Sequence, residues 1–181
     1  MREKLALAVI ALLVCTPAFV HAFDRLSIYF DAALAECTLS DSSPRMANIY
    51  VAEASSYGAT GLRFRIAASP GFTGVWLGET SPFTKIGSSQ TDLSLGFGAC
   101  LVGHFAVLTV TYQLFGTSTC SNLAIAPASG FPVPICTGCQ FDERLCLGYD
   151  PLHVNCSDPV NCNPVAVESV TWGQIKALYR N

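Results

Sequence analysis

The sequence predicts an all-β protein, an antiparallel β-sandwich with an irregular disulfide-rich C-terminal lobe and a short C-terminal helix. Three observations support this fold class. One long segment, residues 104–116, alternates regularly between apolar and less apolar positions. Many shorter alternating segments are separated by Gly, Pro, Ser and Asn. No convincing helical periodicity interrupts them before the last residues, so we expect about seven to nine strands in two packed sheets.

The segment 104–116 is the strand around which the fold is expected to form. Its odd positions change from apolar to polar along the segment, whereas its even positions are all apolar. The apolar set is Ala106, Leu108, Val110, Tyr112 and Leu114. Because successive side chains of a strand point to opposite faces, this pattern predicts a central strand with one buried face and one partly solvated face.

The other strands are expected to be short. Alternating apolar residues between turn residues predict strands at 26–31, 46–52, 61–67, 74–79, 93–97 and 123–126, with 131–136 as a candidate partner of the last. A turn at Ser55–Gly58 is expected to separate the second strand from the third. The stretch 87–92 is predicted to be a loop.

Four parts are predicted along the chain: a signal peptide (1–22), a β-sandwich domain (23–139), an irregular cysteine-rich lobe (140–166), and a tail (167–181) with a short amphipathic helix. Arg2 and Lys4 precede an apolar run that is shorter than the ~20 residues of a spanning helix, and small residues follow at 20–22. A lipoprotein signal at Cys15 is the alternative, although the bulky Val14 before it opposes lipidation. We therefore expect a secreted product, extracellular, at the cell surface or periplasmic, with no stable membrane insertion after cleavage.

The charge balance argues against two classes of partner. The chain has 10 Lys and Arg against 13 Asp and Glu, a formal net charge of −3. A weakly acidic surface with few charges lacks the positive field that attracts nucleic acids and anionic lipids. The sequence therefore predicts no nucleic-acid partner.

Eight of the nine cysteines follow the predicted signal peptide, and an even number in an exported chain predicts a disulfide framework. They are Cys37, Cys100, Cys120, Cys136, Cys139, Cys146, Cys156 and Cys162. Eight cysteines allow 105 pairings, so the connectivity stays open. Cys100 and Cys120 flank the long strand, on the order of 40 Å apart, and are not expected to pair. Cys37 with Cys100, and Cys120 with Cys136 or Cys139, are candidate pairs.

Redox activity and zinc binding are two alternative chemistries for these cysteines. Cys136-Thr137-Gly138-Cys139 has the spacing of a redox-active dithiol, but that chemistry needs a helix after the first cysteine, and no helical pattern follows. A zinc site is the second alternative, but the cysteine spacing is not typical of one and only His153 lies nearby. Structural disulfides are the preferred interpretation.

The sequence predicts no enzyme. After the signal peptide the chain contains only His104 and His153, and it has no Gly-x-Ser-x-Gly nucleophile motif. His104 opens a strand and is interpreted as a structural residue. Acidic and amide residues in loops, such as Asp41 and Asn155, would suit Ca²⁺, but without a calcium-loop motif they are interpreted as turn residues. No catalytic residue, metal or cofactor is predicted.

Trp76 and Phe83 are the candidate ligand face. Together with neighbouring phenylalanines they would form an aromatic platform if they were exposed, although aromatic residues in strands more often belong to the core. An exposed pair would favour recognition of a glycan or a protein, and a buried pair would favour a purely structural role.

Two resemblances add to this interpretation. Residues 46–116, with NIYVAEA, the pattern G-L-x-F-x-I and GHFAVLTVTYQLFG, resemble the cohesin-like and carbohydrate-binding β-sandwich modules of secreted bacterial proteins. The ends, IYFDAALAEC and TWGQIKALYRN, are similar to uncharacterised secreted proteins of Gram-negative environmental bacteria. The resemblance implies an immunoglobulin or cohesin-like fold, export, and no catalytic residues.

The function expected from the sequence is a secreted, disulfide-stabilised recognition module for an unknown glycan or protein partner. A purely structural envelope or extracellular protein is the alternative. A secreted hydrolase with a site in the cysteine-rich lobe is the least favoured possibility.

Overall fold

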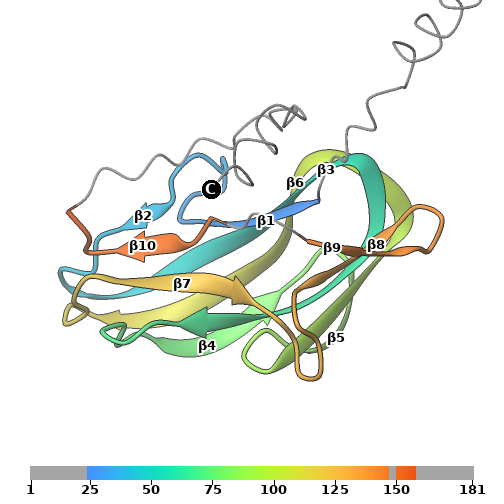
Figure 1. The fold of residues 1–181 in the computed structure, drawn as a ribbon. Coiled ribbons are helices and arrows are strands. Elements are labelled where there is room, and N and C mark those ends of the chain that lie inside the picture. Colours follow the sequence, from blue (N-terminus) through green and yellow to red (C-terminus); the bar gives the residue numbers. More distant parts are fainter. Residues whose placement is uncertain (1–23, 147–149, 158–181) are drawn as a thin grey trace, which may run out of the picture. The chain divides into compact units, whose positions relative to one another are not determined.

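The computed structural model describes residues 24–146 and 150–157, all within the compact unit Ala22–Val167 (Figure 1). This part of the chain contains strands and no helix, as predicted for an all-β protein. The strands are β1 (Arg25–Tyr29), β2 (Thr38–Leu39), β3 (Pro44–Ala68), β4 (Val75–Thr80), β5 (Thr84–Ser88), β6 (Asp92–Phe115), β7 (Ser121–Ala126), β8 (Ile135–Gly138), β9 (Glu143–Leu145) and β10 (Leu152–Val154). A helix long and apolar enough to cross a membrane is not found among these described residues.

Two long antiparallel strands, β3 and β6, form the spine of the fold. They pair from Pro44 opposite Phe115 to Phe64 opposite Leu93. In place of β3 the sequence predicted two short strands, 46–52 and 61–67, with a turn at Ser55–Gly58, and in place of β6 a short strand at 93–97 followed by the long strand 104–116; the predicted breaks are wrong. Shifts of register between Ser55 and Gly61 absorb the irregular residues, so each strand bends and continues instead of ending. Figure 1 shows the two ribbons curving together at this point.

The shorter strands add to the two halves of this spine. Near the Pro44 end, β1 pairs with β3 and β4 pairs with β6. Near the other end, β5 pairs with β6, while β7 and β8 pair with β3. β10 joins β7 on one side and β2 on the other. The buried apolar side chains of these strands pack together as the hydrophobic core.

The alternation that predicted the long strand is confirmed over most of its length. Leu108, Val110 and Leu114 are at most 1% exposed, and Tyr112 is also buried. Ala106 is only half-buried, because the register shift after Val51 leaves one unpaired residue, Val107, which enters the core instead. The bulge therefore reverses the alternation at this position.

Several predicted connections differ from the observed ones. Residues 131–136 do not pair with β7; its partners are β3 and β10. β8, which overlaps the end of that segment, pairs with β3 and with β9. β5 was missed because its side chains are mostly exposed and carry no alternation. The stretch that was predicted as an irregular lobe contains β9, which forms a hairpin with β8, and β10, which pairs with the distant strands β2 and β7.

Three predictions fall outside the described residues. The signal peptide at 1–22 with Cys15, the helix expected within 167–181, and Cys162 all lie there.

Candidate binding surface

Three disulfides tie the loops and hairpins of the described chain. They join Cys100 to Cys139, Cys120 to Cys156 and Cys136 to Cys146, and Cys37 is also disulfide-bonded. The candidate pairs Cys37–Cys100 and Cys120 with Cys136 or Cys139 are therefore wrong, whereas Cys100 and Cys120 are indeed not partners. The two cysteines of the Cys-x-x-Cys segment bond to different partners, so neither a dithiol nor a thiolate zinc ligand is present there.

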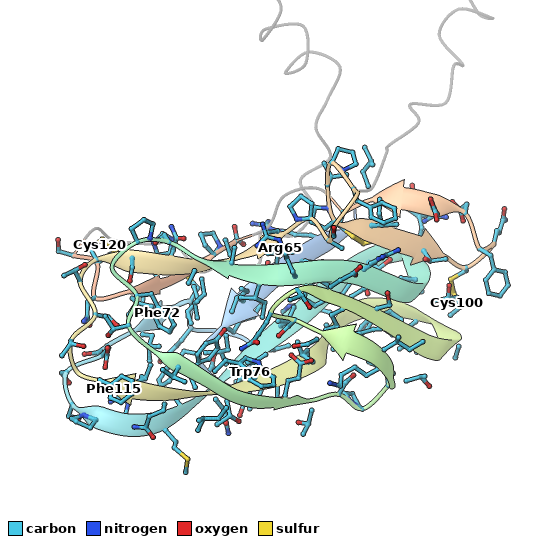
Figure 2. The ribbon with its side chains drawn as sticks, turned by 90° about the horizontal axis from the view of Figure 1, so that it is seen from below. Arg65, Phe72, Trp76, Cys100, Phe115 and Cys120 are labelled. Carbon is cyan, nitrogen blue, oxygen red and sulfur yellow. A yellow bond between two sulfur atoms is a disulfide. The ribbon has the colours of Figure 1, made fainter. Side chains whose placement is uncertain are left out.

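The candidate ligand residues Trp76 and Phe83 are half-buried and pack against the core. Phe83 packs with Phe97 and Phe105, whose ring centroids are 4.6 and 6.3 Å from its own. Trp76 is opposite the buried Tyr112 on β6. Figure 2 shows Trp76 among the strands. These aromatic rings anchor β4 and the following turn to the core rather than forming an open platform.

A different surface is open: the outer face of the sheet formed by β3, β6 and β4. Met46 is opposite Gln113, which is opposite Val75, so these three side chains form one row across three strands. Asn48, Thr111 and Gly78 form the next row, and Pro44 with Phe115 lies on the other side. We call these eight residues the Gln113 face.

The Gln113 face is uncharged and partly apolar. Met46 is 70% exposed, Val75 51% and Phe115 44%. Polar groups lie between them: Thr111 Oγ1 donates to Asn48 Oδ1 at 2.8 Å, and Gln113 Nε2 donates to the Leu114 carbonyl at 2.8 Å. Figure 2 shows Phe115 where β6 ends. Such a mixture of apolar side chains and neutral hydrogen-bonding groups is typical of protein interfaces.

One border of this face is a sheet edge. β4 pairs with β6 on one side and, within the described chain, with no strand on the other. A bulge between Trp76 and Gly78 interrupts the pairing and leaves Leu77 49% exposed. Because bulges discourage indiscriminate edge-to-edge pairing, this edge can border an interface without being an open aggregation site.

Two adjacent carboxylates, those of Glu53 and Asp24, lie in the interior. Glu53 on β3 is fully buried, and neither of its carboxylate oxygens has a hydrogen-bond partner among the described residues. Asp24, also buried, accepts a hydrogen bond from Ser55 Oγ at 2.5 Å. Burial, with the nearby Asp24 charge, raises the pKa of Glu53 to about 8. The Cys136 sulfur near these carboxylates belongs to a disulfide, so it is not a thiolate that could bind a metal.

The two histidines of the described residues, His104 and His153, lie in strands. His104 stacks edge-to-face on Tyr29 at 5.6 Å, and burial lowers its pKa. His153 is opposite Thr38 and Asn122 within the sheet. The carboxylate of Asp150 accepts hydrogen bonds from the Arg25 guanidinium and from Ser27 Oγ, both on β1.

Asp41 and Asn155 lie in connecting segments, where Asp41 is buried and hydrogen-bonded to another segment rather than being a solvated turn residue. Asp41 is 2% exposed and accepts hydrogen bonds from the backbone N–H groups of Gly116 at 2.7 Å and Ser118 at 3.1 Å. Asn155 donates to the carbonyls of Asp41 and Ser118 at 3.0 and 2.7 Å. Together they join three connecting segments at one end of the sheets.

Comparison with solved structures identifies the architecture. A type II cohesin domain from the cellulosome of Acetivibrio cellulolyticus is 12% identical, with a TM-score of 0.51, over 74% of this chain and 96% of that chain. The fold is cohesin-like. A type II cohesin dyad from the adaptor ScaA scaffoldin of the same organism, also 12% identical, gives 0.50 over 74% and 48% of the two chains. No protein-family model matches the chain, and no curated protein matches it significantly.

The cohesin-like resemblance of residues 46–116 is confirmed at the level of fold. These residues contain most of β3 and β6, together with β4 and β5, so the segment that carried the resemblance forms the spine of the cohesin-like sandwich. The carbohydrate-binding part of the resemblance stays a prediction. The sequence missed the Gln113 face, because its row of side chains depends on the register of three strands.

Proposed function

We propose that this cohesin-like chain is an exported recognition module that binds a protein partner through the Gln113 face. The observation that carries the proposal is the exposed row of Met46, Gln113 and Val75 on an uncharged sheet face. Contiguous exposed apolar side chains with neutral polar neighbours on a rigid sheet are favourable for protein association, because burying them costs little desolvation of charge.

A protein partner fits this face better than a glycan. Sugar rings are commonly bound by exposed aromatic platforms, and the predicted platform of Trp76 and Phe83 is packed against the core. The Gln113 face carries aliphatic and thioether groups, and it borders the unpaired edge of β4. Similar solved structures include a cohesin dyad from an adaptor scaffoldin, which is compatible with a role in assembly.

Export is part of the proposal. Its support is the disulfide framework, since disulfides form and persist in oxidising compartments. Intact-mass measurement of the protein recovered from its natural producer tests this directly. A chain beginning at Phe23 is expected, and a chain that retains residues 1–22 would contradict export by signal cleavage.

The binding experiment has two stages. The oxidised protein is used to capture partners from the extracellular and cell-surface fraction of its producer, and each captured protein is purified and titrated by calorimetry. Val75→Glu and Met46→Glu place a charge in the proposed interface, and each is expected to weaken binding at least about tenfold, which is about 1.4 kcal/mol.

Ile86→Glu is the matched control. Ile86 is 71% exposed and lies on β5, opposite Ser94 and outside the Gln113 face. It should bind the partner as the wild type does. The proposal fails if Ile86→Glu weakens binding as much as Val75→Glu, or if purified partners bind both face variants normally. Binding to a glycan array without any protein partner would favour the carbohydrate alternative, and no binding of either kind would favour a purely structural role.

A further inference from the structure

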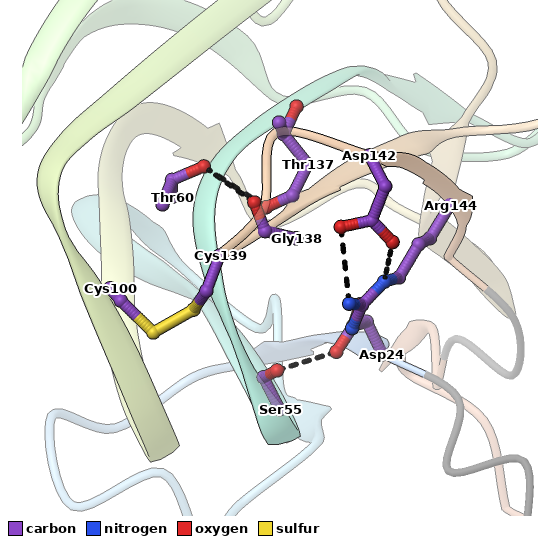
Figure 3. The surroundings of a disulfide bond; sticks show 9 residues. All are labelled: Asp24, Ser55, Thr60, Cys100, Thr137, Gly138, Cys139, Asp142 and Arg144. Atoms are coloured by element: carbon purple, nitrogen blue, oxygen red, sulfur yellow. Dashed lines mark hydrogen bonds and ion pairs between the residues drawn. A yellow bond between two sulfur atoms is a disulfide. The ribbon is translucent and has the colours of Figure 1, made fainter.

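A recessed surface, separate from the Gln113 face, lies beside the Cys100–Cys139 disulfide. It is a cleft of about 630 Å³, and its lining includes Thr60, Gly96, Gly98, the disulfide and Phe141. This volume falls within the ~300–1,000 Å³ that small-molecule sites occupy. Among the residues described along its wall none is charged. Figure 3 shows the disulfide and Thr60 from the surroundings of this cleft.

The floor of the cleft is bare backbone. A Cβ atom added at Gly96 or at Gly98 would meet no atom within 4 Å, so both glycines leave open space where other residues would carry side chains. Gly61, opposite Gly96 on β3, allows no side chain, because its Cβ would lie 2.6 Å from the Leu95 carbonyl oxygen. The two exposed glycines therefore leave a side-chain-free backbone surface against which a ring can pack.

Phe141 is presented at this cleft by a rigid turn. It is 81% exposed and adopts a positive φ of 59°, which is uncommon for a bulky residue. Its N–H donates to the Gly138 carbonyl at 2.9 Å, and the N–H of Gly138 donates to the Asp142 carbonyl at 2.8 Å. The disulfide of the adjacent Cys139 then attaches the turn to β6. A large aromatic side chain held exposed on a stapled turn is preorganised for contact with a ligand.

The polar side chains that line the cleft are few. Thr60 Oγ1 already donates to the Gly138 carbonyl at 3.1 Å, as Figure 3 shows, so it offers a ligand only an acceptor. Thr137 is the other hydroxyl residue of the lining. A sugar ring would bury several hydroxyl groups with too few partners, and each unpaired one is unfavourable. A charged ligand would find no counter-charge among the described side chains that line the cleft.

We propose that this cleft binds an uncharged aromatic molecule of about two or three rings, which stacks on Phe141 and on the glycine floor. Aromatic faces, peptide planes and disulfide sulfur all make favourable contacts with such a ligand. This site is separate from the Gln113 face and does not depend on the protein partner proposed for that face.

Titration of the oxidised full chain with N-phenyl-1-naphthylamine, a neutral fluorophore that brightens in apolar surroundings, tests the proposal. Saturable binding at one site is expected. Gly96→Leu fills the open space on the floor and should weaken binding at least about tenfold. Phe141→Asn keeps a residue that tolerates positive φ and should weaken binding about three- to tenfold through the lost ring contact.

Gly78→Leu is the matched control, since a Cβ at Gly78 also meets nothing within 4 Å but lies on the Gln113 face. It should bind the fluorophore normally, and thermal unfolding is used to check that all variants fold. Equal fluorophore binding by wild type and Gly96→Leu would overturn the proposal. So would the absence of saturable binding, or displacement of the fluorophore by millimolar maltohexaose, which would assign the cleft to sugars.

Discussion

The carboxylates of Glu53 and Asp24 lie within 4.8 Å of each other in the interior of the sandwich, next to the Cys136–Cys146 disulfide. Figure 3 shows Asp24 with its donor Ser55, and the Asp142–Arg144 ion pair beyond it. Burial raises the pKa of Asp24 as well as that of Glu53. Two adjacent buried carboxylates cannot both be charged at low cost, so Glu53 retains its proton near neutral pH.

The stability of the protein should therefore fall as the pH rises through the neutral range. The unfolded chain loses the Glu53 proton above its ordinary pKa of 4.5, whereas the folded chain keeps it until about pH 8. The free energy of unfolding is expected to decrease between these values by as much as about 5 kcal/mol. Urea unfolding at pH 5, 7 and 8 measures this slope.

Glu53→Gln should remove most of this slope, because glutamine resembles the protonated acid and does not titrate. The variant is expected to be more stable than the wild type at pH 8. Glu143→Gln, at an exposed position on β9, is the control and should keep the wild-type profile. A Glu53→Gln variant with the wild-type slope would show that another group carries the pH dependence.

Asp41→Ala should destabilise the protein by about 2–4 kcal/mol, because it leaves the N–H groups of Gly116 and Ser118 without their charged acceptor in a buried place. Asp31→Ala is a matched comparison. Asp31 also accepts two backbone N–H groups, from Ala35 and Glu36, but near the surface, where water replaces it. Its loss should cost about 1 kcal/mol or less. Equal losses in urea unfolding would contradict the argument from burial.

Gly58→Ala should interfere with the Cys100–Cys139 disulfide. Gly58 has a φ of +84°, and a Cβ atom there would lie 2.6 Å from both sulfur atoms. Gly130→Ala is the control that separates backbone strain from the steric clash with sulfur. Gly130 has a similar φ of +83°, but a Cβ atom there would meet nothing within 4 Å. The control should lose only about 1 kcal/mol of stability. Thiol titration with DTNB in denaturant should find free cysteines in Gly58→Ala alone; an intact disulfide with equal stability of the two variants would refute the prediction.

Removing the Cys120–Cys156 disulfide by a double substitution to serine should reduce stability by about 3–4 kcal/mol, the value expected for a loop closed across 36 residues. The effect should be largest in β10, whose neighbouring N–H groups of His153 and Asn155 bond to Cys37 and Leu39. Hydrogen exchange of these amides is the measurement. Unchanged protection there would show that backbone pairing with β2 and β7 holds β10 without the disulfide.

Much of the fold was predictable because strand patterns are local. The period of two places Leu108, Val110, Tyr112 and Leu114 on one face whatever surrounds them, and hydrophobicity makes that face the buried one. The same alternation could have revealed Glu53, which continues the buried series Ile49 and Val51 in NIYVAEA. The cohesin-like pattern of 46–116 was visible for the same reason.

The tertiary structure alone decided which distant residues meet. Cys100 and Cys139 are 39 residues apart in sequence, and their pairing depends on how β8 lies along β3. The register of three strands decides that Met46, Gln113 and Val75 form one exposed row. Side-chain period is a property of the neighbouring backbone, whereas register and proximity are set by the packing of the whole chain. The proposed surfaces follow from register and proximity, whereas the cohesin-like scaffold that carries them follows largely from side-chain period.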